Sequence, residues 1–394
     1  MNPIFRSLVH YIIDVIHWGV NIIFPKNKYK IIFQSGPDDY VDNSRALSDY
    51  ILKNEKYNKY KIYWAFKSDV VKNVDPRIRG FNRISRFGKI LYFYHTVTAK
   101  YLFSTHAAFE WSCSARQKYF CLWHGTMLKK IACLQDPIAN KYYMRHCKMF
   151  ASPSIFYNEI VGKSFGRDNS FAYNTGYPRT DLLFEKTDSL NKLSLNKEDK
   201  IVLYMPTFRT PINSNYSDSN LDIYEKGVIN FKDNNSVNKW NEYLKTRKIQ
   251  LIVKPHPSDA NIPSEIKLSN IKVLTNSELS NADVQLYHLL NEADALLTDF
   301  SSVFCDYLVL NRPIGFVVTD LEEYSKGRGF VFDAPIDYMP GVIIKNTNQF
   351  KLFLDEISNG IDSSKFKRES LFKIYNDYND NNNCSRVLSS VGIE

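Results

Sequence analysis

The chain has 394 residues, of which 44% are hydrophobic and 24% are charged, a balance that indicates folded domains and excludes a disordered protein. This length favours two domains of ordinary size over a single one. The 51 Lys and Arg residues outnumber the 42 Asp and Glu residues, so the net charge is +9. A basic balance favours an anionic partner, such as a nucleotide, a phospholipid surface or a nucleic acid.

The first expected element is a helix from Ile4 to Phe24, in an N-terminal segment of residues 1–27. Its apolar residues fall mostly on one helical face, and polar residues interrupt it throughout. A secretory signal would have an unbroken apolar core, and Asp14 in mid-segment argues against a spanning helix. The pattern predicts an amphipathic helix lying on a membrane surface, with packing against the protein's own core as the alternative.

Short apolar strands then alternate with helical patterns over residues 28–190, with strands expected at 29–34, 60–66, 99–103, 119–123 and 149–151. Within this part, the stretch from Arg77 to Lys89 holds five basic residues interleaved with Phe81, Ile84 and Phe87, and no acid. Such a stretch suits an anionic lipid surface, and an ordinary solvated basic helix is the alternative. The alternation predicts an α/β domain with a parallel sheet.

The polar segment from Glu185 to Lys200 is expected to connect this domain to a second one over residues 200–375. Strands are expected there at 201–204, 250–253, 271–274, 295–297 and 313–318, with closing helices at 350–358 and 366–375. The Asn- and Asp-rich stretch from Asn376 to Asn383 is expected to be a solvated turn or tail. Two Rossmann-like halves facing each other would enclose a central cleft at the carboxyl ends of their strands.

The six cysteines form no C-x-x-C pair and show no metal-ligand spacing with histidine. Reduced thiols in a cytosolic protein are the simplest interpretation. We therefore expect neither a metal site nor a cofactor.

The most informative stretch runs from Leu297 to Asp306, where an apolar strand is followed by hydroxyl and carboxyl side chains and then by a helical pattern. The N-terminus of a helix offers unpaired backbone N–H groups and a partial positive charge, which suit an anion. An ordinary N-cap is the alternative. The candidate substrate-binding residues here are Thr298, Asp299, Ser301, Ser302 and Asp306.

Polar motifs follow four other apolar segments in the same way, and their residue types agree with one another. Arg and Lys can neutralise phosphate oxygens, Gly lets the backbone approach a ligand, and histidine exchanges protons near neutral pH. A single histidine after a strand is more often structural, and prolines on both sides of one also make a rigid turn. The motif residues are His124, Gly125, Thr126, Arg179, Pro206, Thr207, Arg209, Lys254, Pro255 and His256.

Six motifs occur in order: Trp123-His-Gly-Thr-Met-Leu-Lys-Lys, Gly176-Tyr-Pro-Arg-Thr-Asp, Met205-Pro-Thr-Phe-Arg, Lys254-Pro-His-Pro, Leu297-Thr-Asp-Phe-Ser-Ser-Val and Arg328-Gly-Phe-Val-Phe-Asp. This series resembles the CDP-glycerol glycerophosphotransferase family of teichoic-acid and capsule synthesis. The likeness runs from about Gln34 to about Gly341 and so covers most of the chain.

The resemblance implies a GT-B-like fold of two Rossmann-like domains, with the CDP-linked donor held mainly by the C-terminal one. It also implies transfer of glycerol phosphate from CDP-glycerol to a hydroxyl of a lipid-linked acceptor, with release of CMP, at the cytoplasmic face of the cell membrane. His124 resembles the general base, and His256 resembles the group that steadies the pyrophosphate. The expected donor contacts are Thr126, Arg179, Thr207, Arg209, Thr298, Ser301 and Ser302.

Two positions depart from the family's usual pattern. Met127 stands where Pro usually follows His-Gly-Thr, and Phe300 replaces the usual Tyr of the Thr-Asp-Tyr-Ser-Ser motif. These changes leave open a different donor, such as CDP-ribitol. A nucleotide-sugar glycosyltransferase on the same plan is a further alternative, and scattered charge argues against a nucleic-acid-binding protein.

Overall fold

The computed structural model describes residues 3–36, 39–106, 109, 111, 114–138, 140, 142–207, 228–256, 262–327 and 329–394. Arg209, Pro257 and Arg328, named above in the motifs, lie outside the described residues. The chain divides into two compact units. Unit 1 comprises Met1–His124, Ala132–Asp181 and Asp380–Glu394, and unit 2 comprises Gly125–Ile131 and Leu182–Asn379.

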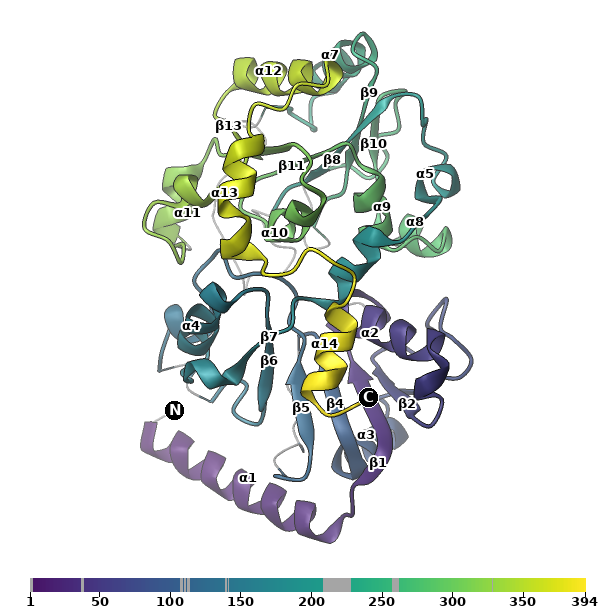
Figure 1. Ribbon diagram of the computed structural model, residues 1–394, viewed down its shortest axis with the longest axis vertical. Coiled ribbons are helices and arrows are strands. Elements are labelled where there is room, and N and C mark those ends of the chain that lie inside the picture. The colour runs from purple at the N-terminus through teal and green to yellow at the C-terminus, as the bar shows by residue number, and fades with distance from the viewer. Residues whose placement is uncertain are drawn as a thin grey trace. The chain divides into compact units, whose positions relative to one another are not determined.

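Unit 1 is built on a seven-stranded sheet in the order β3-β2-β1-β4-β5-β6-β7, in which every neighbouring pair is parallel (Figure 1). Its core is aromatic: the ring of Phe33 stacks on those of Trp64 and Phe103 at centroid distances of 5.3 and 5.2 Å. The strands are β1 (Asn27–Gln34), β2 (Lys61–Phe66), β3 (Arg79–Asn82), β4 (Ala99–Ser104), β5 (Lys118–Cys121), β6 (Met149–Ser152) and β7 (Ala172–Asn174).

Helices of both α and 3-10 type accompany this sheet. The α-helices are α1 (Pro3–Ile23), α2 (Asp42–Lys53), α3 (Arg86–Thr98), α4 (Ile155–Ser164) and α14 (Asn383–Ser390). The 3-10 turns are η1 (Glu55–Tyr57), η2 (Ala132–Leu134), η3 (Asn169–Phe171) and η4 (Pro178–Phe184). Side chains of Ser85 and Ser154 cap α3 and α4 by accepting hydrogen bonds from Gly88 N and Tyr157 N.

Unit 2 is built on a six-stranded parallel sheet in the order β10-β9-β8-β11-β12-β13. The strands are β8 (Lys200–Met205), β9 (Ile249–Val253), β10 (Ile271–Val273), β11 (Ala295–Thr298), β12 (Ile314–Val317) and β13 (Val342–Ile344). The helices are α5 (Ser189–Lys192), α7 (Asn234–Lys245), α8 (Asn276–Asn281), α9 (Leu286–Glu292), α10 (Val303–Tyr307), α11 (Leu321–Gly327), α12 (Thr347–Ser358) and α13 (Lys365–Tyr375), with η5 (Leu308–Leu310) and η6 (Pro335–Tyr338).

Three expectations from the sequence need correction. The basic stretch from Arg77 to Lys89 is not one helix, because it forms β3, a turn and the start of α3. The polar segment from Glu185 to Lys200 belongs to unit 2, where the Glu292 carboxylate accepts hydrogen bonds from the backbone of residues 189 and 190. Its polarity therefore reflects surface exposure within a folded unit.

The Asn-rich stretch is not simply a solvated tail, because both of its ends are buried. Asn376 donates a hydrogen bond to the carbonyl of Cys305 in unit 2 at 2.6 Å. Asn383 donates to Thr180 Oγ1 in unit 1 at 2.7 Å and begins α14. Asparagine satisfies backbone and hydroxyl groups here, so a polar composition does not imply exposure.

None of the helices that the structure describes combines the length and apolar character needed to cross a bilayer. Among the described cysteines, Cys121, Cys133, Cys147, Cys305 and Cys384 are free thiols.

Candidate active site

In unit 1, His124 follows β5 in a turn with unusual backbone geometry. The residue before it, Trp123, has φ of 54°, a value that non-glycine residues rarely adopt. Gly125 after it has φ of 136°, which a side chain would disfavour. The buried Asn43 side chain donates a hydrogen bond to the Trp123 carbonyl at 2.8 Å. The turn is thus fixed from α2, and the strain is typical of a functional position.

The imidazole of His124 is half-buried and lies between two rings of unit 1. It stacks on His106 at a centroid distance of 4.1 Å and an angle of 7°, and it contacts the tilted ring of Trp123 at 4.1 Å and 31°. A glycine makes room for this pair, because a Cβ at Gly36 would come within 2.5 Å of the His106 ring. His106 was missed by sequence reasoning. The available signal was its place two residues after β4, beside β5 in the sheet.

Arg179, an expected donor contact, lies in unit 1 and is 6% exposed. Its guanidinium donates to Asp42 Oδ1 at 2.8 Å, and its backbone N–H donates to Asn43 Oδ1 at 3.0 Å. Asp42 itself has φ of 63°, so the start of α2 is strained. The ion pair and hydrogen bond therefore hold the same Asn43 that fixes the His124 turn.

In unit 2, three of the expected site residues make hydrogen bonds where β8 and β11 end side by side. The Thr298 hydroxyl donates to the Met205 carbonyl at 2.7 Å. The Asp299 carboxylate accepts from the backbone N–H of Thr207 at 3.0 Å and from its hydroxyl at 2.9 Å. All three side chains are buried. Their polar atoms therefore join the two strand ends.

Ser301 and Ser302 are partly exposed at the start of α10, so their hydroxyls are the accessible ones of this motif. Ser301 Oγ accepts a long hydrogen bond of 3.5 Å from Val303 N. The Ser302 side chain makes no capping hydrogen bond among the described residues. Asp306, by contrast, is fully buried and accepts a hydrogen bond from the Tyr287 hydroxyl. That position favours a structural role for Asp306.

The segment after His124 packs within unit 2 and connects three of the sequence motifs. Lys129 pairs with Phe330 in an antiparallel bridge, and Val331 N donates to the Leu128 carbonyl at 3.0 Å. The Phe300 ring is fully buried against Tyr324 and Phe330, at centroid distances of 4.4 and 5.3 Å. Phenylalanine thus fits this position because the ring is enclosed by other rings.

Thr126, at the start of this segment, is 3% exposed, and its hydroxyl has no hydrogen-bond partner among the described residues. A buried hydroxyl without a partner is uncommon and calls for an explanation.

The Lys254-Pro-His motif follows β9. Lys254 is 6% exposed, and its ammonium donates to the Pro255 carbonyl at 3.1 Å. His256 is exposed and marks the end of the described residues on this loop. Pro206 is buried beside Thr207. Arg209, from the β8 motif, lies outside the described residues.

Comparison with known proteins assigns the chain to a family. Residues 16–392 match the model of the CDP-glycerol:poly(glycerophosphate) glycerophosphotransferase family. The chain belongs to this family. The resemblance found in the sequence is therefore confirmed, and with it the assignment to a family of transferases.

Two curated relatives come from Bacillus spizizenii. The chain is 29% identical over 369 residues to a teichoic acid poly(glycerol phosphate) polymerase, covering 88% of this chain and 87% of that protein. It is 25% identical over 370 residues to a teichoic acid poly(ribitol-phosphate) polymerase, covering 89% of this chain and 54% of the relative. The chain spans roughly half the length of this second relative and of two further poly(glycerol phosphate) polymerases.

A similar solved structure is that of the wall teichoic acid polymerase TagF, with a TM-score of 0.74 and 21% identity, covering 99% of this chain and 97% of that one. Together with the two parallel sheets, this likeness confirms the α/β, GT-B-like fold class with two Rossmann-like units.

Proposed function

We propose that this chain transfers glycerol phosphate from CDP-glycerol to a hydroxyl of a lipid-linked glycan or polyol-phosphate acceptor, releasing CMP, in teichoic-acid or capsule synthesis. The observation that carries the proposal is the family match over residues 16–392. Five of the six sequence motifs lie at the carboxyl ends of strands, namely β5, β7, β8, β9 and β11. Residues 1–27 are the proposed membrane-associating segment. The rest of unit 1 is the proposed acceptor domain, and unit 2, whose main part begins at Leu182, is the proposed donor-binding domain.

His124 is the proposed general base. Its imidazole would take the proton from the acceptor hydroxyl as that oxygen attacks the phosphorus of the glycerol phosphate group. The bond from this phosphorus to CMP then breaks, and CMP leaves with the electron pair. The stacked ring of His106 and the fixed turn at Trp123 support this role, because a base must be held in one orientation to be effective.

The proposed donor site lies in unit 2. Phosphoryl transfer needs positioning and charge neutralisation more than covalent help. The accessible hydroxyls of Ser301 and Ser302 can donate to phosphate oxygens, as can the buried hydroxyl of Thr126, which has no partner within the described part of the chain. His256 is proposed to steady the pyrophosphate. In this proposal Thr207, Thr298 and Asp299 hold the strand ends in place and do not bind the ligand themselves.

Ribitol phosphate is the alternative transferred group. One relative is a poly(ribitol-phosphate) polymerase that matches 89% of this chain. Glycerol is favoured because the family model and the first relative are both of the glycerol phosphate type.

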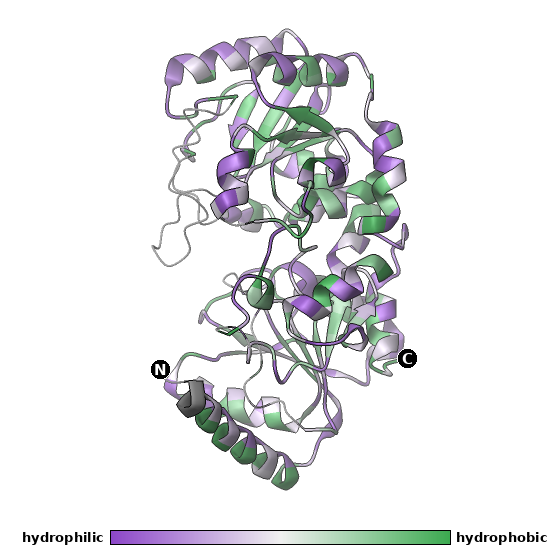
Figure 2. Cartoon of the chain, turned by 90° about the vertical axis from the view of Figure 1, so that its left-hand side faces the viewer, coloured by the Kyte–Doolittle hydropathy of each residue, from purple (hydrophilic) through white to green (hydrophobic). Residues whose placement is uncertain are grey.

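Attachment to a membrane surface is proposed through α1 and the start of α3. The polar residues His17 and Asn21 of α1 are 4% and 3% exposed, so this helix turns a polar face inward. Its apolar side chains are outside, with Tyr11 and Trp18 67% and 66% exposed, and Figure 2 shows the apolar residues along this helix. A helix that only packed on a protein core would bury its apolar face instead.

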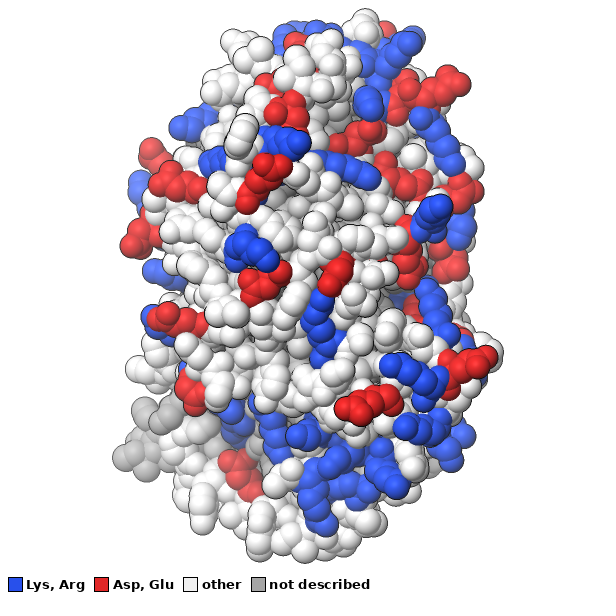
Figure 3. All heavy atoms as spheres, viewed as in Figure 1, with Lys and Arg blue, Asp and Glu red and all other residues white. Residues whose placement is uncertain are grey.

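The start of α3 adds to this surface within unit 1. Phe87 and Ile90 are 68% and 63% exposed beside the exposed Arg86 and Lys89. Figure 3 shows Lys and Arg side chains crowded on the part of unit 1 in view. Cationic and apolar side chains together suit an anionic lipid surface, which is where a lipid-linked acceptor would lie.

The test is to incubate the purified chain with a defined lipid-linked acceptor and CDP-glycerol, CDP-ribitol or a nucleotide sugar, and to measure nucleotide release and product mass. We expect CMP release and a mass increase of glycerol phosphate units with CDP-glycerol. Release only with CDP-ribitol would establish the alternative, and release only from a nucleotide sugar would contradict the phosphotransferase proposal.

A further inference from the structure

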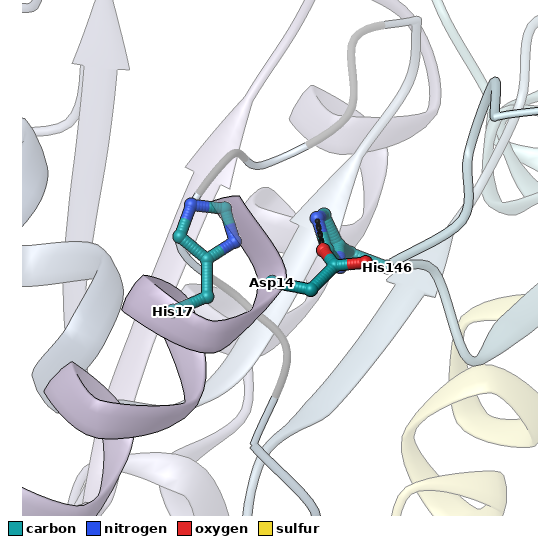
Figure 4. A group of neighbouring side chains, drawn as sticks. All are labelled: Asp14, His17 and His146. Carbon is teal, nitrogen blue, oxygen red and sulfur yellow. Dashed lines mark ion pairs between the residues drawn. The ribbon is translucent and has the colours of Figure 1, made fainter. Parts of the chain in front are cut away.

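Three side chains that can bind a metal lie close together at the inward face of α1, away from the strand-end loops. Asp14 and His17 come from α1, and His146 comes from the loop before β6 (Figure 4). One potential ligand atom of each lies within 4.8 Å of the others. His146 Nε2 is 3.5 Å from Asp14 Oδ1, and the rings of His17 and His146 are 4.9 Å apart.

Two nitrogens of this cluster are buried and have no hydrogen-bond partner among the residues that the structure describes. His17 is 4% exposed, and its Nδ1 has no partner among the described residues. The same holds for His146 Nε2, whose approach to Asp14 lacks hydrogen-bond geometry. Buried polar atoms are nearly always satisfied, so two together indicate a missing partner.

The surroundings of both histidines disfavour a positive charge on their rings. Burial and the neighbouring Arg145 guanidinium lower the pKa of His17 below its ordinary value, although Asp14 opposes this. Burial, Arg145 and His17 together lower the pKa of His146 to about 4, again against Asp14.

We propose that Asp14, His17 and His146 form a site for a divalent transition metal, with zinc as the best match. Two imidazoles and a carboxylate are a donor set that zinc accepts. Bond lengths of about 2.0–2.2 Å place tetrahedral ligand atoms roughly 3.3 Å apart, so small side-chain rotations close the present spacing. Asp14 is 46% exposed, which leaves a fourth position for water.

Two other groups face the cluster. Arg145 Nε lies 3.2 Å from Asp14 Oδ1, and its side chain is 23% exposed, so it can turn towards solvent when a metal takes its place. His10 lies one turn before Asp14, and it is close enough that a charge on it would disfavour a positive charge on His146. Arg145 therefore competes with the metal for the same carboxylate.

The consequence would be a cross-link between α1 and the body of unit 1. The metal would join two positions on the helix to the loop at residue 146 and so fix the helix with its apolar face outward. The sequence shows no sign of this site, because its ligands contain no cysteine and His146 is far in the sequence from Asp14 and His17. The inference concerns metal binding only and does not depend on the proposed transfer reaction.

The first test is titration of the metal-stripped full-length chain with Zn²⁺ in competition with a chromogenic chelator. We expect one equivalent of Zn²⁺ to bind. Loss of a residue that only hydrogen-bonds to a metal ligand weakens metal binding by roughly 10–100-fold. His17→Ala and His146→Ala should each weaken it by more than this, because they remove a ligand. His288→Ala, which removes a histidine paired with Glu185 in unit 2, is the matched control and should bind normally. Arg145→Gln should bind more tightly, because it removes the competing cation.

A second measurement uses the unaltered chain and so does not depend on how a variant folds. Co²⁺ should bind at one equivalent per chain and give the visible spectrum of a tetrahedral nitrogen- and oxygen-ligated site. Absence of stoichiometric binding, an octahedral spectrum, or binding that survives both histidine substitutions would overturn the proposal.

Discussion

The strand-end loops of the two units use the same kind of residues in different ways. In unit 2, the polar side chains at the strand ends bond to the protein itself: Thr207 donates to Asp299, and Thr298 donates to a backbone carbonyl. In unit 1, Asn43 of α2 donates a hydrogen bond to the backbone of the loop after β5. The His124 ring of this loop stacks on His106 and remains half-exposed. Polar residues after a strand therefore mark either scaffolding or a reactive group, and only their partners distinguish the two.

The largest effect should come from His124→Asn. Loss of a general base lowers the rate by about 10²–10⁴-fold, so CMP release should fall by that factor. The thermal melt should change little, because the ring is only half-buried and its turn is held by Asn43. The matched control is His288→Asn in unit 2, which should leave CMP release unchanged. Equal losses in both variants, or a collapsed melt for His124→Asn alone, would assign His124 to the scaffold.

Asp299→Ala should have the next largest effect. It should lower the free energy of unfolding and leave the rate of CMP release per folded molecule largely unchanged. It leaves the buried N–H and hydroxyl of Thr207 without their acceptor, and each such group costs about 1–3 kcal/mol. Urea unfolding should show this loss. Asp299→Asn retains one acceptor oxygen and should lose less. A fall in donor affinity at unchanged stability would instead identify Asp299 as a ligand contact.

Ser301→Ala combined with Ser302→Ala should raise the KM for CDP-glycerol about tenfold or more, because hydrogen bonds to charged groups contribute about 1.5–3 kcal/mol. The unfolding free energy should stay nearly constant, because both side chains are partly exposed and the contact of Ser301 to Val303 N is long, at 3.5 Å. An unchanged KM would contradict the proposed donor contacts at the start of α10.

The sequence predicted most of the fold, because hydrophobic alternation is strong in buried parallel strands. It missed β3, β7 and β13, which are only three or four residues long and carry little pattern. It found the strand-end motifs but could not show that Asp299 and Thr298 bond inward, since hydrogen-bond partners come from a neighbouring strand. His106 and the cluster at Asp14 were missed because their partners are distant in the sequence.

Phe300→Tyr should have the smallest effect. It tests most directly whether a residue at a strand end supports the fold or contacts the ligand. The Phe300 ring is fully buried against Tyr324 and Phe330, so an added hydroxyl meets apolar surroundings and should cost about 1 kcal/mol of stability. Urea unfolding of both proteins measures this cost, and Phe304→Tyr, at another fully buried ring in unit 2, is the matched control. A lower KM for CDP-glycerol without loss of stability would show that the hydroxyl reaches the ligand, and position 300 would then belong to the donor site and not to the packing around it.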